Sequence, residues 1–148
     1  EAMRMVCALA VECLELRPGG ILFVEDAEAQ GLLVVVHGRL QYLTVQEEGS
    51  DDESTKDLEP TTEQVEEKQF LSEASLWVDW RHKGVLEALT SASVLKISAA
   101  KFVETMMSFP TAATIIQDYC EKYQASICAS RHVSDTETGV QHCEVEIG

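Results

Sequence analysis

The chain has 148 residues, of which 45% are hydrophobic, enough for one domain with its own core. Its 26 acidic residues outnumber 11 basic ones and give a net charge of −15, which argues against a nucleic acid or an anionic membrane as partner. The longest apolar run, 32–36, is too short to cross a bilayer, so direct membrane insertion by this segment is not expected.

The first part of the chain predicts one helix and three short strands. Residues 2–16 place apolar side chains at intervals of three and four, which is typical of an amphipathic helix. Cys7 and Cys13 lie in this pattern and are predicted to be small core residues. Strands are predicted at 21–24, 32–36 and 39–45, separated by a polar turn and by His37 and Gly38.

An acidic segment follows at 47–67. It contains ten acidic residues and one lysine, a net charge of −9 that leaves −6 for the rest of the chain. Because few of its residues are large and apolar, it is predicted to be a disordered or mobile loop inserted in the domain. Calcium binding is the alternative, but Asp51, Asp52 and Glu53 lack the alternating ligands and central glycine of an EF-hand loop.

The second half predicts two more strands and then helices. Residues 70–80 form a short mixed unit, and strands are predicted at 84–89 and 94–97. Ser98 offers an N-cap to a helix that Pro110 ends, and a longer helix is predicted over 111–129. The tail, 130–148, is predicted to be flexible or to add a strand at 140–147. The order of elements predicts a mainly β domain over 1–129, a β-sandwich or jelly roll with terminal helices.

Motifs for catalysis or metal binding are not recognisable. The sequence has no nucleophile elbow, phosphate loop or paired-histidine metal motif, so no enzyme and no cofactor is predicted. The five cysteines are an odd number without the spacing of a disulfide scaffold, which predicts free thiols in a reducing, cytoplasmic compartment. A zinc site at Cys128, His132, His142 and Cys143 is disfavoured by its spacing.

Several stretches resemble the cyclic nucleotide-binding domain family. The sequence LRPGGILF at 16–23, and GLLVVVHGRL at 31–40, match the family's Pro-Gly, its apolar strands and the glycine between them. FLSEASL at 70–76 lies where the family has Phe-Gly-Glu and a short apolar helix, and 85–88 and 94–98 lie on its last two strands. The resemblance covers about residues 3–125 and implies a β jelly roll with N-terminal and C-terminal α-helices. Within the family, the chain looks more like divergent domains of protist and algal potassium channels than like the kinase subunit, which implies the cytoplasmic domain of a membrane protein.

The resemblance also implies a ligand site. In the family, a short cassette holds a cyclic nucleotide with backbone N–H groups, a glutamate on the ribose hydroxyl and an arginine on the phosphate. By correspondence Glu73 is the hydroxyl partner, and the position of the arginine is taken by His82, with Arg81 just before it. Backbone or hydroxyl contacts to the phosphate are expected from the remaining cassette residues, Leu71, Ser72, Ala74 and Ser75.

Three departures from the family pattern weaken the predicted site. Ser72 replaces a glycine where the backbone approaches the phosphate, Asp26 and Ala27 replace an acidic Gly-Asp turn, and His82 replaces the arginine. Losing a charge-assisted hydrogen bond of roughly 1.5–3 kcal/mol would weaken binding by about 10- to 150-fold. An alternative interpretation puts His82 in a solvated basic turn. Trp77 and Trp80 are interpreted as packing residues, with stacking on a nucleobase as the alternative.

Two functions therefore compete. The first is a regulatory module that binds cAMP or cGMP and passes closure of its C-terminal helix to an attached effector, an ion channel or a kinase. The alternative is a degenerate domain that binds no nucleotide and serves assembly or interaction. A pocket filled by the chain's own side chains would favour the alternative.

Overall fold

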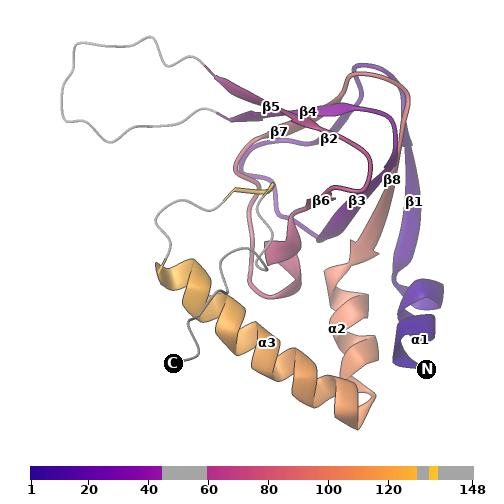
Figure 1. The fold of residues 1–148 in the computed structure, drawn as a ribbon, viewed down its shortest axis with the longest axis vertical. Coiled ribbons are helices and arrows are strands. Elements are labelled where there is room, and N and C mark those ends of the chain that lie inside the picture. The colour runs from indigo at the N-terminus through magenta and orange to yellow at the C-terminus, as the bar shows by residue number, and fades with distance from the viewer. Residues whose placement is uncertain (45–59, 130–133, 137–148) are drawn as a thin grey trace.

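The computed structural model describes residues 1–44, 60–129 and 134–136, which form a β-roll with helices at one end (Figure 1). Within these ranges no helix combines the length and the apolar character needed to span a membrane. The elements in chain order are α1 (Ala2–Leu9), β1 (Val11–Leu16), β2 (Ile21–Phe23), β3 (Gly31–His37), β4 (Leu40–Thr44), β5 (Thr61–Val65), β6 (Phe70–Leu71), the 3₁₀ helix η1 (Glu73–Leu76), β7 (Val85–Ala88), β8 (Ala92–Ser98), α2 (Ala99–Met107) and α3 (Pro110–Ala129).

The strands form two antiparallel sheets that face each other. One sheet has the order β1-β8-β3-β6, and the other has the order β2-β7-β4-β5. The alternation of the two faces is clearest in β3 and β4, where Leu33 and Val35, and Leu40 and Tyr42, are buried and the residues between them are not. The core between the sheets consists of Phe23, Leu33, Val35, Leu40, Tyr42, Val65, Leu71, Leu86, Ala88, Ala92 and Val94. The predicted mainly β fold with terminal helices is confirmed.

The predicted N-terminal helix is too long. It ends at Leu9, and Val11–Leu16 forms β1, which pairs with β8 in register from Val11 opposite Ile97 to Leu16 opposite Ala92. Without β1, the backbone groups on this edge of β8 would lack their partners, and this long-range pairing overrides the local helical spacing. Cys7 and Cys13 are both exposed, so their predicted place in the core is wrong.

The predicted acidic loop is wrong in its last part. Thr61–Val65 is strand β5, which pairs with β4 along its whole length, and Val65 is buried opposite Leu40. The pairing with β4 and the burial of one valine outweigh the polar composition of the segment. The rest of the predicted loop that precedes Pro60 lies outside the described residues, as does the strand predicted at 140–147.

The C-terminal helices begin where the sequence indicates. The Ser98 side chain accepts a hydrogen bond from the backbone N–H of Lys101 (3.4 Å), which confirms it as the N-cap of α2. Pro110 opens α3, a position that suits proline because its missing N–H has no partner in the first turn. Figure 1 shows α3 running obliquely below the roll, with η1 between them.

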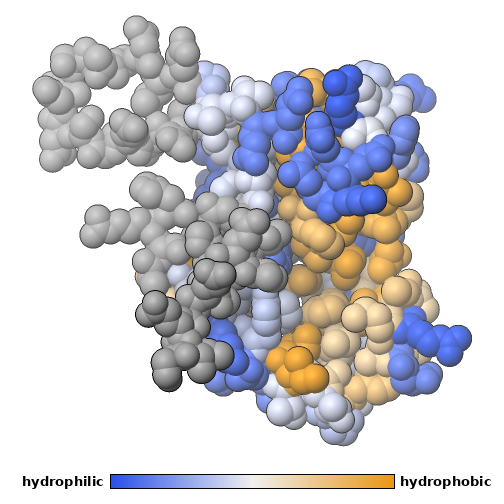
Figure 2. Space-filling model, in the orientation of Figure 1, coloured by the Kyte–Doolittle hydropathy of each residue, from blue (hydrophilic) through white to orange (hydrophobic). Residues whose placement is uncertain are grey.

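Hydrophobic residues also reach the surface near the N-terminus. Figure 2 shows them gathered on the half of this face that lies over β1, β8 and the helices α1 and α2. Met3 and Leu9 on α1 are 61% and 52% exposed. The site described next is built by β4, by the cassette and by the segment 80–83 that precedes β7.

Candidate functional site

The cassette begins at a residue with unusual backbone geometry. Ser72, between β6 and η1, has a φ of 59° and a ψ of 35°, the left-handed conformation that favours glycine. This explains why a glycine is expected at this position. Ser72 is buried, its carbonyl accepts from the Ser75 hydroxyl (2.7 Å), and its backbone N–H donates to the carbonyl of Asp135 (2.6 Å).

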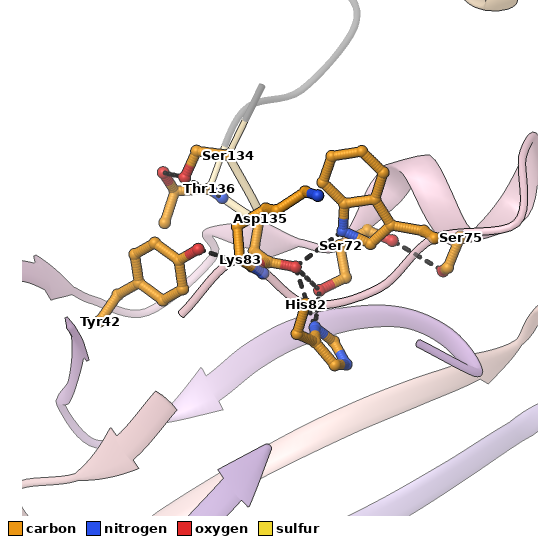
Figure 3. Close-up of polar contacts among 9 residues, drawn as sticks. Tyr42, Ser72, Ser75, His82, Lys83, Ser134, Asp135 and Thr136 are labelled. Atoms are coloured by element: carbon orange, nitrogen blue, oxygen red, sulfur yellow. Dashed lines mark hydrogen bonds and ion pairs between the residues drawn. The ribbon is translucent and has the colours of Figure 1, made fainter. Parts of the chain in front are cut away.

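The Asp135 side chain lies in the middle of the site (Figure 3). Its Oδ1 accepts hydrogen bonds from the Trp80 indole (2.9 Å), the His82 ring Nδ1 (2.9 Å) and the Ser72 hydroxyl (3.2 Å). Its Oδ2 accepts from the Tyr42 hydroxyl (2.5 Å) and from the backbone N–H of Lys83 (2.7 Å). Asp135 is fully buried, so its charge depends on these donors and not on water.

These contacts also set the ionisation of the group. Burial by itself would raise the pKa of Asp135, but hydrogen bonds from His82, Tyr42, Trp80 and the Lys83 backbone lower it overall, below the usual range of a carboxyl group. Burial raises the pKa of the Tyr42 hydroxyl, and the adjacent Asp135 raises it further. Tyr42 therefore stays protonated and donates, while Asp135 stays ionised and accepts.

His82 forms the floor of the site. It is 6% exposed, and its ring stacks on Phe23 with centroids 3.7 Å apart and an interplanar angle of 5°. Because a carboxylate can only accept, Nδ1 of His82 carries the proton in its contact with Asp135. The alternative interpretation of His82 as part of a solvated basic turn is wrong, because the turn exposes Arg81 and Lys83 but buries the histidine between them.

Glu73, the predicted ribose partner, faces the C-terminal helix. Its Oε1 accepts from the Tyr119 hydroxyl (2.9 Å) and from the Trp77 indole (3.4 Å). Trp77 packs against Tyr119 with centroids 4.8 Å apart and meets Phe102 edge-on at 6.0 Å. Trp77 is therefore a packing residue that joins the cassette to α2 and α3.

The other predicted site residues have different surroundings. Leu71 is a residue of the sandwich core. Ala74 packs with Trp80 and Tyr123 in a second cluster of buried residues. Arg81 points away from the site and donates to the carbonyl of Asp26 (2.8 Å). Of the seven predicted residues, Ser72 and His82 contact the Asp135 side chain, and Ser75 supports Ser72.

Two residues of the site, Tyr42 and Asp135, were not predicted. Lys83 was considered only as a cation that could turn towards an anion beside His82, whereas its backbone N–H makes the contact. Trp80 was interpreted as packing. Trp80 is buried as expected, but its indole N–H also donates to Asp135. Tyr42 and Asp135 are 93 residues apart, and no local pattern links them. The one available signal was the negative charge of Asp135, the single aspartate of the tail 130–148, which could pair with the hydrogen-bond donors of the cassette.

The chemistry of the arrangement is that of an anion receptor. Hydroxyl, indole, imidazole and backbone donors converge on one buried anionic group, as they would on a phosphate. Within the described residues, every buried polar side-chain atom has a partner. The carboxylate of Asp135, from the same chain, therefore satisfies the donors of this receptor.

The fold is that of cyclic nucleotide-binding domains, in agreement with the resemblance found in the sequence. A candidate cAMP-binding regulatory protein from Silicibacter pomeroyi DSS-3 matches with a TM-score of 0.59 and 19% identity over 85% of this chain, which spans only 53% of that protein. The N-terminal domain of a transcriptional regulator from Streptomyces coelicolor A3(2) matches with a TM-score of 0.65 and 17% identity over 92% of this chain and 89% of that one.

A channel domain has the same fold. The C-linker/CNBHD of zELK channels, crystallised in the presence of cAMP, matches with a TM-score of 0.61 and 16% identity, over 81% of this chain and 55% of that one. No model of a known protein family matches the chain, and no curated protein matches it in sequence. The likeness is therefore one of fold.

Proposed function

We propose that this domain is a self-occupied regulatory module that serves assembly or interaction and does not bind a cyclic nucleotide. The observation that carries the proposal is the Asp135 carboxylate, which holds the donors that an anionic ligand would need. The tail segment Ser134–Thr136 thus takes the place of a ligand. The domain then works in the state that a ligand would otherwise induce.

The two charged contacts of the family's nucleotide site support the same conclusion. Glu73 is engaged by Tyr119 and Trp77, so its carboxylate faces α3 and not a ribose. The arginine is replaced by His82, whose Nδ1 is engaged by Asp135. A nucleotide would have to displace Asp135 and would bring its phosphate to a site without a permanent cation, so its net gain in free energy would be small.

A sensor of cAMP or cGMP is the second candidate. It is favoured by one observation, the donor set around Asp135, because hydroxyl, indole and backbone N–H donors also suit a phosphate. In this mechanism the nucleotide displaces the tail segment, and α3 closes over the cassette that holds the nucleotide. The attached effector would be a channel or a kinase in the cytoplasm.

Calorimetry separates the two candidates. Wild-type protein and the variant Asp135→Ala are titrated with cAMP and with cGMP, and Asp118→Ala, which removes an exposed carboxylate on α3, is the matched control. We expect no binding by the wild type or the control at millimolar nucleotide. Micromolar binding by the wild type would overturn the proposal in favour of the sensor. Binding by Asp135→Ala alone would support it, because it would show that the tail segment closes the site.

A further inference from the structure

We infer that the pocket around Asp135 is a peptide receptor, which takes a short segment presenting an aspartate and which can exchange its own tail segment for the same kind of segment from a partner chain. The inference rests on the proposed self-occupied function and names the class of partner. It is carried by contacts to the peptide backbone, to the carboxylate and to a flanking residue.

The first contact recognises peptide backbone. The N–H of Ser72 donates to the backbone carbonyl of Asp135 at 2.6 Å, the shortest hydrogen bond of the cassette's backbone. Neither inorganic phosphate nor a cyclic nucleotide has a peptide carbonyl at a fixed distance from its anionic group. Ser72 therefore contacts the occupant twice, through its backbone at the carbonyl and through its hydroxyl at the side chain.

The second set of contacts selects a carboxylate. The donors divide between its two oxygens, with Trp80, His82 and Ser72 on Oδ1 and Tyr42 and Lys83 on Oδ2. An asparagine could accept on only one of these sides, and its NH₂ group would face donors on the other. Tyr42 and Trp80 are of the residue types that dominate binding energy at interfaces.

The third contact lies beside the aspartate. The Thr136 hydroxyl donates to Glu63 of β5 (3.0 Å), and the Ser134 hydroxyl accepts from the backbone N–H of Thr136 (3.3 Å). The second bond holds the segment in a turn that points the Asp135 side chain inward. The receptor thus contacts a hydroxyl residue on the side of the aspartate that faces β5.

Exchange with a partner depends on concentration. A segment tethered to its own receptor has an effective concentration in the millimolar range when the linker is short, so a partner's segment competes poorly with it. Removing the Asp135 carboxylate by substitution keeps the receptor side intact and removes this competitor. A peptide supplied in trans should then restore the contacts.

The test uses the variant Asp135→Ala of the 148-residue chain and a synthetic peptide with the sequence of residues 131–139. Binding is measured by calorimetry and by tryptophan fluorescence, to which Trp80 contributes from its place beside Asp135. We expect the peptide to bind the variant and not the wild type. Peptides with asparagine or glutamate in place of the aspartate should bind at least about tenfold more weakly, because one loses the charge and the other misplaces it by a methylene group.

A receptor-side variant is the control for specificity. Tyr42→Phe in the Asp135→Ala background removes one donor to the carboxylate and should weaken the peptide by about tenfold or more. If Asp135→Ala does not fold, as judged by circular dichroism, Asp135→Asn takes its place because it keeps the shape of the side chain.

Two results would overturn the inference. The first is equal binding of the aspartate and asparagine peptides by the variant. The second is no binding of either peptide, whether or not the variant binds inorganic phosphate or cAMP. The proposed function fails separately, by nucleotide binding to the wild type.

Discussion

At the scale of single residues, Asp135 has the most demanding environment in the described chain. A buried ionised carboxylate is tolerated only when donors replace its lost hydration, and here they come from β4, from the cassette and from the segment 80–83 that precedes β7. Three segments of the chain therefore donate hydrogen bonds to the same carboxylate, that of Asp135. Removal of that group should loosen all three.

The substitution Asp135→Asn tests this tie. It leaves donors facing an NH₂ group, so we expect the free energy of unfolding at neutral pH to fall by about 1–3 kcal/mol, as for a buried group left unsatisfied. Urea denaturation followed by tryptophan fluorescence gives the difference. Asp118→Asn, which breaks an exposed pair with Lys122, should change stability by no more than about 0.5 kcal/mol. Equal effects of the two variants would contradict the role of Asp135.

The contribution of Asp135 should also depend on pH. Its pKa is lower in the folded than in the unfolded protein, so the ionised group stabilises the fold above the unfolded value of about 3.9. This stabilisation is lost as the pH falls below that value and through the folded pKa. We therefore expect the difference between wild type and Asp135→Asn to be constant from about pH 5 to 7 and to shrink below about pH 4. A difference that grows on acidification would refute this sign.

Ser72 combines backbone strain with useful hydrogen bonds. Its left-handed conformation costs about 1–2 kcal/mol for a residue with a Cβ, while its hydroxyl donates to Asp135. Ser72→Ala keeps the strain and loses the hydroxyl, whereas Ser72→Gly loses both. We expect the glycine variant to be more stable than the alanine variant by about 1 kcal/mol in urea unfolding. The reverse order would mean that Ser72 is not strained.

At the scale of elements, the sequence predicts those strands and helices whose signals are local. β3 is β-branched, α2 has a serine cap and α3 starts at a proline, and all three form as predicted. β1 and β5 were misassigned because both lie at positions where pairing with a distant strand decides the conformation. Local spacing cannot report a partner that lies far away along the chain.

β5 provides a test of this explanation. If Thr61–Val65 is a true strand of the sandwich, Val65→Ala removes buried methyl groups beside Leu40 and should cost about 2 kcal/mol of unfolding free energy. Thr62→Ala, at an exposed position of the same strand, should cost less than about 0.5 kcal/mol. Urea unfolding distinguishes the two variants, and a Val65→Ala effect as small as that of Thr62→Ala would show that β5 is not part of the core.

The site was predictable to the same extent as the elements. The family pattern points to Ser72 and His82 through local motifs, and the structure brings these two side chains together at 3.3 Å. It could not reveal that the occupant is Asp135, because the contacts join residues 52 to 93 positions apart. It also could not show that Glu73 faces Tyr119, since that depends on how α3 packs.

At the scale of the whole molecule, the cassette is held from two sides. Ser72 is tied to the tail segment, and its neighbour Glu73 is tied to α3. Both ties are made by residues C-terminal to the roll. The chain's own residues thus hold the cassette on both sides, as the proposed self-occupied module requires.

The net charge of −15 is the other property of the whole chain, and it should make stability sensitive to salt. Acidic groups repel one another in the compact state, while an exposed ion pair of the described ranges, Lys122 with Asp118, offsets little of this. Salt shortens the Debye length from about 10 Å at 0.1 M to about 3 Å at 1 M, so it weakens the repulsion more than the buried pair of His82 and Asp135.

We therefore expect the urea midpoint to rise when sodium chloride is increased over that range, with an unchanged m-value. The triple variant Asp51→Asn, Asp52→Asn, Glu53→Gln, which lowers the net charge to −12, should have a higher midpoint than the wild type at low salt and a smaller response to salt. Asp135→Asn should respond to salt as the wild type does, because the group that it changes is shielded from the solvent. A midpoint that falls with salt would mean that attractive ion pairs, and not repulsion among the acidic residues, dominate the electrostatics of the folded chain.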